Sequence, residues 1–191
     1  RLVSEIVPIS IGATTVRDDE QPGRARLEKI PQLKPAFKPT GTITAANASS
    51  ISDGASALII AGSDALHNDP LARVVGHATH SIHPSQFTIA PVGAIQKLVE
   101  KIGWQIADVD LFEINEAFAM VTMLATQELE LDPNTVNIYG GACAQGHPIG
   151  STGSRLIVTL AHAMKNQNKK RGIAALCIGG GEATAIALER D

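Results

Sequence analysis

The spacing of apolar and polar positions divides the chain into a polar amino-terminal part and a strongly patterned remainder. Apolar residues recur at helical spacing over 91–102, and Gly103 follows as a helix terminator. Helices are also predicted at 117–129 and 151–165. Short apolar runs predict strands at 58–61, 71–77, 109–114, 136–139, 173–178 and 183–188.

The order of these elements after residue 70 is β-α-β-α-β-α-β-β. Strands that alternate with helices form a sheet whose faces the helices cover. Only Gly179-Gly180-Gly181-Glu182 separates the last two apolar runs, which predicts a terminal hairpin. The pattern therefore predicts an α/β fold with a mixed sheet covered by helices.

Residues 5–38 differ from the rest of the chain because prolines and charged residues interrupt every apolar stretch. This pattern predicts irregular structure rather than core. The basic residues of this part are interpreted as a solvated face, with contact to a phosphorylated ligand as the alternative. They are Arg17, Arg24, Arg26, Lys29, Lys34 and Lys38.

Composition narrows the class of protein. The 191 residues are 44% hydrophobic, 18% charged and 3% aromatic, with 17 glycines, so the interior must be aliphatic and closely packed. Few aromatic side chains disfavour a nucleic-acid or sugar binder, which needs stacking platforms. The net charge of −3 supplies no general field for polyanions, so local groups must meet any anionic ligand.

The two cysteines bear on the compartment. Cys143 and Cys177 lie in glycine-rich apolar contexts, which argues against a disulfide-stapled secreted domain and favours a cytoplasmic location. Apolar runs are too short to span a bilayer and no leader follows Arg1, so we expect no membrane partner. Because Arg1 is an unusual start, the sequence suggests a later piece of a longer protein.

In α/β proteins, functional sites lie where strands lead into helices, because strand ends present side chains and helix starts present free N–H groups. At the first junction, Asn115 and Glu116 interrupt an apolar passage from strand to helix. One interpretation is structural: Asn115 caps the helix and Glu116 favours its positive end. A functional role for the pair is the alternative.

The second junction is the glycine-rich stretch 140–151, which contains His147 followed by Pro148. Glycines leave room for a ligand, and histidine titrates near neutrality. A lone histidine is often structural or merely exposed. Glycine-rich loops before helices are disproportionately functional, however, so His147 is a candidate catalytic residue.

At the third junction, Cys177 ends an apolar strand and is followed by three glycines. Backbone N–H groups in such a turn can stabilise an oxyanion, so this turn and Cys177 are candidates for a site. The alternative is that Cys177 is a small core residue, since cysteine is among the most buried types. For Cys143 the core interpretation is the stronger one.

A repeat of histidines at 77, 80 and 83 suggests a metal site at first sight. On an extended strand, however, His77 and His80 would face opposite sides. No cysteine, aspartate or glutamate nearby completes a ligand set. We therefore expect no metal.

At the three junctions the sequence closely resembles the thiolase family of acyl-CoA acyltransferases. The family's carboxy-terminal blocks read Asn-Glu-Ala-Phe-Ala, Gly-His-Pro-Ile-Gly and Cys-x-Gly-Gly-Gly, and they occur here in the same order. Similarity extends upstream through 41–49 and 53–55 and downstream to 188–190. The resemblance covers nearly the whole chain and implies a thiolase-type fold.

The resemblance implies a role for each catalytic position. His147 corresponds to the histidine that activates a nucleophilic cysteine and helps bind a thioester oxygen. Cys177 corresponds to the acid/base that shuttles a proton at the α-carbon. Asn115 would hold a water that completes the enolate oxyanion hole, and the N–H of Gly179 would serve the other oxyanion hole.

The binding positions follow from the same resemblance. Ser49 corresponds to a serine that touches the pantetheine arm of coenzyme A, and Ala117 and Phe118 of the first block are expected beside the substrate. At Ser50 the family usually has glycine, and Glu182-Ala183 also departs from the family pattern. These differences affect the fit of the substrate arm and of the turn.

The resemblance also implies the domain organisation. Residues 1–47 would end a coenzyme-binding loop region, 48–69 would be a remnant of the first core domain, and 70–191 would form the second core domain. The family's nucleophilic cysteine belongs to an earlier block, and neither Cys143 nor Cys177 has that context. The chain would thus be the later half of a thiolase.

The function implied is reversible acyl transfer between acyl-CoA thioesters, by Claisen condensation or thiolysis, in fatty acid metabolism. Coenzyme A and acyl-CoA would be substrates, no metal or bound cofactor is needed, and the parent enzyme is expected to be a homo-oligomer. Without the missing amino-terminal half, the chain is expected to be inactive. A decarboxylating ketoacyl synthase would carry histidine at position 177. The alternative from another class is a catalytically silent module that acts in subunit association.

Overall fold

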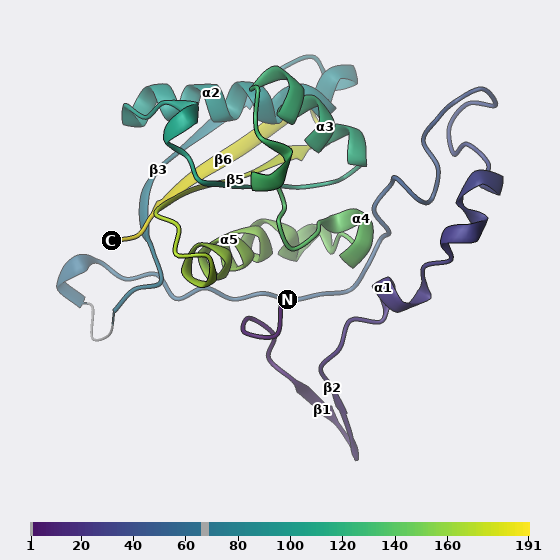
Figure 1. The fold of residues 1–191 in the computed structure, drawn as a ribbon, viewed down its shortest axis with the longest axis horizontal. Helices are drawn as coiled ribbons and strands as arrows, with labels where there is room; N and C mark the ends of the chain where they lie inside the picture. The colour runs from purple at the N-terminus through teal and green to yellow at the C-terminus, as the bar shows by residue number, and fades with distance from the viewer. Residues whose placement is uncertain (1, 66–68) are drawn as a thin grey trace.

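The computed structural model describes residues 2–65 and 69–191, and a four-stranded mixed sheet lies at its centre (Figure 1). The strand order is β3-β6-β5-β4; β4 runs parallel to β5, and β6 runs antiparallel to both β5 and β3. These strands are β3 (Arg73–Ser81), β4 (Leu111–Ile114), β5 (Arg171–Ile178) and β6 (Glu182–Glu189). The predicted α/β fold and the terminal hairpin are confirmed.

Helices cover both faces of this sheet. The helices α2 (Ala90–Ile102) and α3 (Ala119–Glu128) lie on one face, and α5 (Ile149–Asn166) lies on the other (Figure 1). The three predicted helices are therefore confirmed, with ends shifted by a few residues. A short α4 (Ala142–Gln145) precedes α5, and 3-10 helices occupy Ser63–Ala65, Pro84–Ile89, Ile106–Asp108 and Pro133–Thr135.

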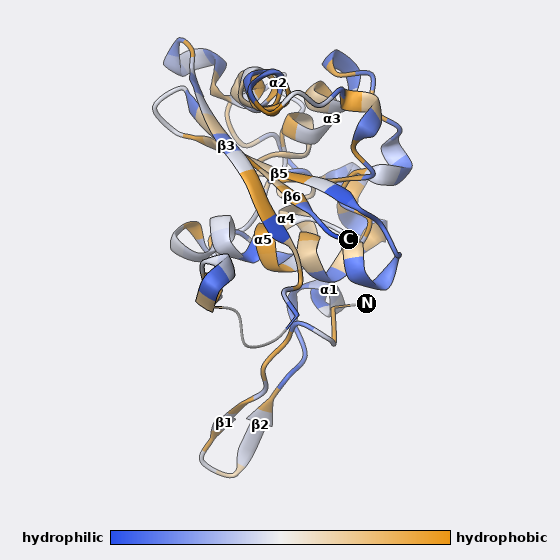
Figure 2. Ribbon diagram, turned by 90° about the vertical axis from the view of Figure 1, so that its left-hand side faces the viewer, coloured by the Kyte–Doolittle hydropathy of each residue, from blue (hydrophilic) through white to orange (hydrophobic). Residues whose placement is uncertain are grey.

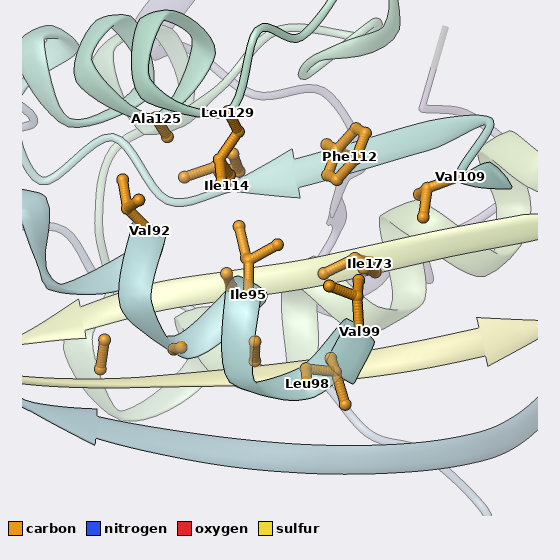
Figure 3. Close-up of a cluster of buried hydrophobic side chains, with 14 of the residues drawn as sticks. Val92, Ile95, Leu98, Val99, Val109, Phe112, Ile114, Ala125, Leu129 and Ile173 are labelled. Carbon is orange, nitrogen blue, oxygen red and sulfur yellow. The ribbon is translucent and has the colours of Figure 1, made fainter. Parts of the chain in front are cut away.

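The core between α2 and the sheet explains why this helix forms where it does. Pro91 stands in the first turn, where a missing N–H costs nothing, and Gly103 ends the helix at φ 72°. Ile95 and Leu98 of α2 are fully buried, and they belong to the same apolar cluster as Phe112 of β4 (Figure 3). The helical period of the sequence is thus the period of burial.

The opposite face is built from the apolar side of α5. Leu160 and Met164 are fully buried against the sheet. A Cβ at Gly172 would lie 2.7 Å from the Met164 sulfur and 2.8 Å from Leu160 Cδ1. Glycine on β5 therefore lets α5 approach the sheet closely.

The predicted strands differ from the structure in three places. Residues 58–61 form no strand, because the described chain provides no neighbouring strand with which to pair. Residues 136–139 make only an isolated bridge, Phe112 with Val136. The strand expected at 71–77 lies at 73–81 instead, since pairing with β6 decides its length.

The amino-terminal part contains more local structure than the pattern predicts. The short strands β1 (Ile9–Ile11) and β2 (Thr14–Val16) form a hairpin that projects from the body, followed by α1 (Gln21–Arg24) and a 3-10 helix at Leu27–Gln32 (Figures 1 and 2). None of these elements contains a buried residue. The prediction that this part contributes no core is confirmed.

Candidate active site

Asn115 stands directly after β4, at the end of the sheet that faces the glycine-rich loop. Its backbone N–H donates to the carbonyl of Ala175 at 2.9 Å, which extends the pairing of β4 with β5. Its side chain is fully buried, and Nδ2 lies 3.3 Å from Nε2 of His147. Helix α3 begins after Phe118, so the interpretation of Asn115 as a helix cap is wrong.

His147 is fixed from three directions. Its backbone N–H donates to the carbonyl of Ser50 at 2.9 Å, and its Nδ1 lies 2.6 Å from the hydroxyl of Thr152. The Thr152 hydroxyl donates to the carbonyl of Pro148 at 3.0 Å, so it accepts a hydrogen bond from Nδ1–H. Nε2 is then the unprotonated nitrogen and accepts from the Asn115 amide.

The surroundings of His147 favour the neutral imidazole. Burial lowers its pKa below the ordinary value for histidine, and the positive charge of Arg155 lowers it further. A neutral ring with an unprotonated Nε2, held here by the Asn115 amide, is the form that can accept a proton. His147 therefore lies in the structure as a neutral ring whose orientation is fixed by its hydrogen bonds.

Cys177 lies near the end of β5, opposite Ala183 of β6. The side chain is buried among apolar residues, and this burial raises the pKa of its thiol. Cys177 therefore rests as a neutral thiol, a form that can donate a proton. It stands two residues beyond Ala175, the residue that holds the Asn115 backbone.

Gly179 follows β5 in the exposed turn that leads to β6. Nothing lies within 4 Å of the position that a Cβ would occupy there. The turn itself is set by Gly181, whose φ is 90° and whose Cβ position would lie 2.3 Å from the carbonyl oxygen of Ile82. A rigid glycine turn thus leaves open space beside the backbone of Gly179.

The three expected binding residues lie together. The Ser49 hydroxyl donates to the carbonyl of Ala117 at 3.1 Å, and the Ser49 N–H reaches the same oxygen at 3.2 Å. Phe118 bridges to Ala48 and stacks edge-on with Phe37 at 5.8 Å between ring centres. Positions that are 68 residues apart in sequence therefore form one local structure.

One extended segment joins the first two sequence blocks. Asn47 accepts from Ala119 N–H at 2.9 Å on one side, while Ser50 accepts from His147 N–H on the other. The hydroxyl of Ser50 accepts from the side-chain amide of Gln21 at 2.9 Å. Residues 47–51 thus link the amino-terminal part to both blocks, and the side chain that replaces the usual glycine contacts Gln21.

Cys143 is a poor candidate for a nucleophile. Burial raises the pKa of its thiol to about 12, and the nearby Glu116 carboxylate adds to this shift. The Glu116 carboxylate accepts a hydrogen bond from the Cys143 N–H at 3.0 Å, so this glutamate holds the backbone of the loop before His147. Burial raises the pKa of both thiols, so neither Cys143 nor Cys177 lies in the environment of a reactive thiolate.

Several residues of the site were missed by the sequence analysis. Thr152 is fully buried and orients His147; its only signal was a hydroxyl one helical turn after Pro148, in a first turn that has other small polar residues. Arg155 has both terminal nitrogens buried without a hydrogen-bond partner, and burial raises the pKa of the nearby Glu113 to about 8. No repeating pattern in the sequence distinguishes a buried ionisable side chain from an exposed one, so these residues could not be identified in advance.

Cavities and metals add little to the site. A hollow of about 360 Å³ lies beside the loop and is lined by residues 52–56 and 148–151, whereas a larger one lies away from His147 near Tyr139.

In the described ranges, no three His, Cys, Asp or Glu side chains are arranged to hold a metal ion. His77 is exposed and His80 is half-buried, in line with opposite faces of β3. Across the same ranges, every helix is too short or too polar to cross a bilayer.

The fold and the site together define an α/β protein in which a hydrogen-bonded histidine on a glycine-rich loop meets a buried asparagine after β4, with a buried thiol and a glycine turn at the end of the neighbouring strand β5. The sequence matches the thiolase carboxy-terminal domain over residues 68–190 and the thiolase amino-terminal domain over residues 1–64. The chain belongs to the thiolase family.

Known proteins of the same family resemble the chain closely. It is 48% identical to a probable acetyl-CoA acetyltransferase of Dictyostelium discoideum over 93% of this chain and 44% of that protein. It is 45% identical to the cytosolic acetyl-CoA acetyltransferase of Mus musculus over 97% of this chain and 49% of that protein. The chain spans about half the length of these relatives.

A solved structure supports the same relation. The human mitochondrial 3-ketoacyl-CoA thiolase in complex with CoA superposes with a TM-score of 0.92 at 41% identity. The match covers 96% of this chain and 48% of the human chain. The expected thiolase-type fold is therefore confirmed.

Proposed function

We propose that this chain supplies one half of a thiolase active site, which carries out reversible acyl transfer between acyl-CoA thioesters. The observation that carries the proposal is the series of hydrogen bonds from Thr152 through the His147 ring to Asn115, in a member of this family. The series defines the tautomer of His147 and aims Nε2 at the Asn115 amide. Such preorganised groups are what acyl transfer requires.

In the proposed mechanism, His147 accepts the proton of a nucleophilic thiol that another part of the enzyme provides. The thiolate then attacks the thioester carbonyl, the bond from that carbonyl to the sulfur of coenzyme A breaks, and coenzyme A leaves as its thiolate, so that an acyl-enzyme remains. The reaction is thereby divided into two easier steps. Once Nε2 is protonated, it and the Asn115 amide are both donors and hold the oxygen that gains negative charge, directly or through a water.

Cys177 is assigned proton transfer at the α-carbon, and the Gly179 N–H is assigned the second oxyanion hole. The buried Cys177 rests as a thiol, so its thiolate needs a stabilising group before it can act as a base. This requirement supports the view that the site is completed by further protein. The proposed chemistry uses no metal and no bound cofactor.

Coenzyme A and its thioesters are the proposed ligands. One relative of known structure was solved with CoA, and here Ser49, Ala117 and Phe118 lie together beside the segment that bonds to His147. We place the pantetheine arm against these residues. The proposal also includes a role in fatty acid metabolism and a parent enzyme that is a homo-oligomer. It places the enzyme in the cytoplasm or an organelle matrix, and the cytosolic mouse relative favours the cytoplasm.

Activity of the chain by itself tests the role of the missing nucleophile. We expect a pure, mass-verified sample of the 191-residue chain to show no thiolysis of acetoacetyl-CoA by coenzyme A, because neither Cys143 nor Cys177 serves as nucleophile. Addition of an amino-terminal thiolase half that bears the cysteine should restore turnover. Robust activity of the chain alone would contradict this assignment.

The role of Cys177 has a separate test in the completed enzyme. Cys177→Ala should abolish exchange of the α-protons of acetyl-CoA with solvent while acylation of the nucleophile continues. Proton NMR in heavy water follows the exchange, and mass spectrometry follows the acyl-enzyme. Cys143→Ala is the control and should leave exchange unchanged.

A catalytically silent module that acts in subunit association is the second candidate. Exposed apolar side chains favour it: Ile59 is fully exposed, and Ile9 and Ile11 of the projecting hairpin are also exposed. Such surfaces are typical of association sites. If the 191-residue chain binds an amino-terminal half that bears the nucleophile, but the resulting complex does not turn over thioesters, this second candidate is correct.

A further inference from the structure

The side chain of Asn137 is hydrogen-bonded to both backbone polar groups of one residue, Ile114, at the end of β4. Its Oδ1 accepts from Ile114 N–H at 2.8 Å, and its Nδ2 donates to the carbonyl of Ile114 at 2.8 Å. This is the pattern that a neighbouring strand would provide. Asn137 thus replaces a strand at the edge of the sheet.

The backbone of Asn137 shows why a side chain performs this task. Val136 bridges to Phe112, and the Asn137 N–H donates to the Phe112 carbonyl at 2.8 Å, so pairing starts as in a strand. At Asn137 the φ angle is 47°, which turns the chain away from β4. Asparagine tolerates this left-handed conformation better than most residues and has an amide that mimics a peptide.

The residue that Asn137 holds, Ile114, immediately precedes Asn115. On the other edge of β4, the Asn115 N–H is held by Ala175 of β5 at 2.9 Å. The chain is therefore fixed from both sides at the residue whose buried amide lies 3.3 Å from His147 Nε2. A displacement of Ile114 would therefore move the Asn115 amide relative to His147 Nε2.

Asn137 also lies beside the loop that carries His147. Its carbonyl accepts from Gly140 N–H at 2.8 Å, which closes the turn into that loop. A Cβ at Gly141 would lie 3.0 Å from Asn137 Nδ2 and 2.4 Å from Glu116 Oε2. The loop therefore packs directly on the Asn137 amide and on the residue after Asn115.

We propose that Asn137 is a positioning residue that sets the placement of Asn115 relative to His147. The proposal rests on the function assigned above to that pair, but the contact itself is a property of this chain. Asn137 touches neither substrate nor the reacting atoms in this role. It acts through Ile114 and through the turn at Gly140.

The variants Asn137→Asp and Asn137→Gly separate the clamp from the backbone conformation. Aspartate keeps an acceptor for Ile114 N–H but sets a second oxygen against the Ile114 carbonyl. Glycine keeps the positive φ and removes both bonds. Asn168 has φ 51° on an exposed turn after α5, far from the site, so Asn168→Asp and Asn168→Gly are matched controls.

The readout is the titration of His147 in the 191-residue chain, followed by ¹H–¹⁵N NMR of its ring nitrogens. Because the Asn115 amide donates to Nε2, it favours the neutral ring. Loosening this contact should raise the His147 midpoint by about 0.5 pH unit in both Asn137 variants. The Asn115 side-chain amide signal should shift as well, and neither Asn168 variant should change either quantity.

An unchanged His147 midpoint and Asn115 signal in folded Asn137→Asp would overturn the proposal, even if stability fell, because a merely structural role predicts that result. If Asn137→Gly does not fold, Asn137→Asp still decides. In the unmodified chain, the Ile114 amide should exchange about tenfold more slowly than an unbonded edge amide. Fast exchange there would also overturn the proposal.

A kinetic measurement extends the test to the completed enzyme. With an active amino-terminal half supplied, Asn137→Asp should lower kcat about tenfold and change KM less than about twofold, since orientation rather than binding is lost. A change in KM alone contradicts the positioning role. If the unmodified enzyme is inactive, the proposed function fails, whereas the NMR result still decides the role of Asn137.

Discussion

The amino-terminal region, residues 2–65, and the carboxy-terminal region, residues 69–191, contain similar apolar side chains but bury them to different extents. Every buried hydrophobic residue of the described chain lies between 90 and 188. In the amino-terminal region Ile59 is 100% exposed and Val7 is 80% exposed. Apolar composition therefore does not make a core; neighbouring elements are needed to cover the side chains.

The largest expected effect comes from the buried side of this comparison. Ile95→Ala removes a fully buried side chain between α2 and the sheet and should lower the free energy of unfolding by about 3 kcal/mol. Ile59→Ala removes the same atoms from a fully exposed position and should change it by less than about 0.5 kcal/mol. Urea titration of both variants gives the two values. Equal losses would refute the comparison.

A buried charge provides the next effect. Glu113 is buried, and its pKa is raised to about 8, so the folded chain binds its proton more strongly than the unfolded chain does. The stability from the protonated carboxyl is complete below the ordinary pKa of about 4.5 and is lost as pH rises through about 8.

Glu113→Gln should therefore be more stable than the parent chain at high pH and nearly equal to it at acidic pH. We expect a gain of about 2 kcal/mol above pH 8, reduced by the loss of attraction to Arg155. Thermal unfolding from pH 5 to pH 9 measures the difference. The exposed Glu128→Gln is the control and should show no such trend; a constant difference for Glu113→Gln across this range would argue against the raised pKa.

The smallest effect is expected for a charge pair in the amino-terminal region. Arg24 and Glu20 are 2.8 Å apart, with both side chains largely exposed. Arg24→Ala should change the free energy of unfolding by less than about 0.5 kcal/mol, because solvent and salt screen such pairs. Urea titration at low and high salt tests this. A loss of the size expected for Ile95→Ala would show that the region is more tightly packed than its exposure indicates.

The helices were the most predictable part of the fold, and the strands without neighbours were the least. A helix satisfies its own backbone hydrogen bonds, so the pattern at 91–102 was enough to locate α2 to within a residue. A strand depends on a partner that sequence proximity does not reveal. The apolar runs at 58–61 and 136–139 therefore looked like strands and do not form them.

The candidate site divides in the same way. The residue types and blocks around Asn115, His147 and Cys177 are visible in the sequence and indicate the thiolase family by themselves. That Ser49 bonds to Ala117, or that Asn137 clamps Ile114, depends on contacts across 68 and 23 residues. The assigned chemical roles remain predictions that the experiments above test.

The helices, the terminal hairpin and the three blocks of the site could all be located from the order of residues, because local period, glycine placement and residue type are properties of neighbouring residues. Three contacts became visible only in the folded chain: Thr152 bonds to His147, Asn115 lies against His147 rather than at a helix end, and the guanidinium of Arg155 lies near the buried Glu113. These contacts arise where sheet and helices meet, and burial there changes both geometry and pKa.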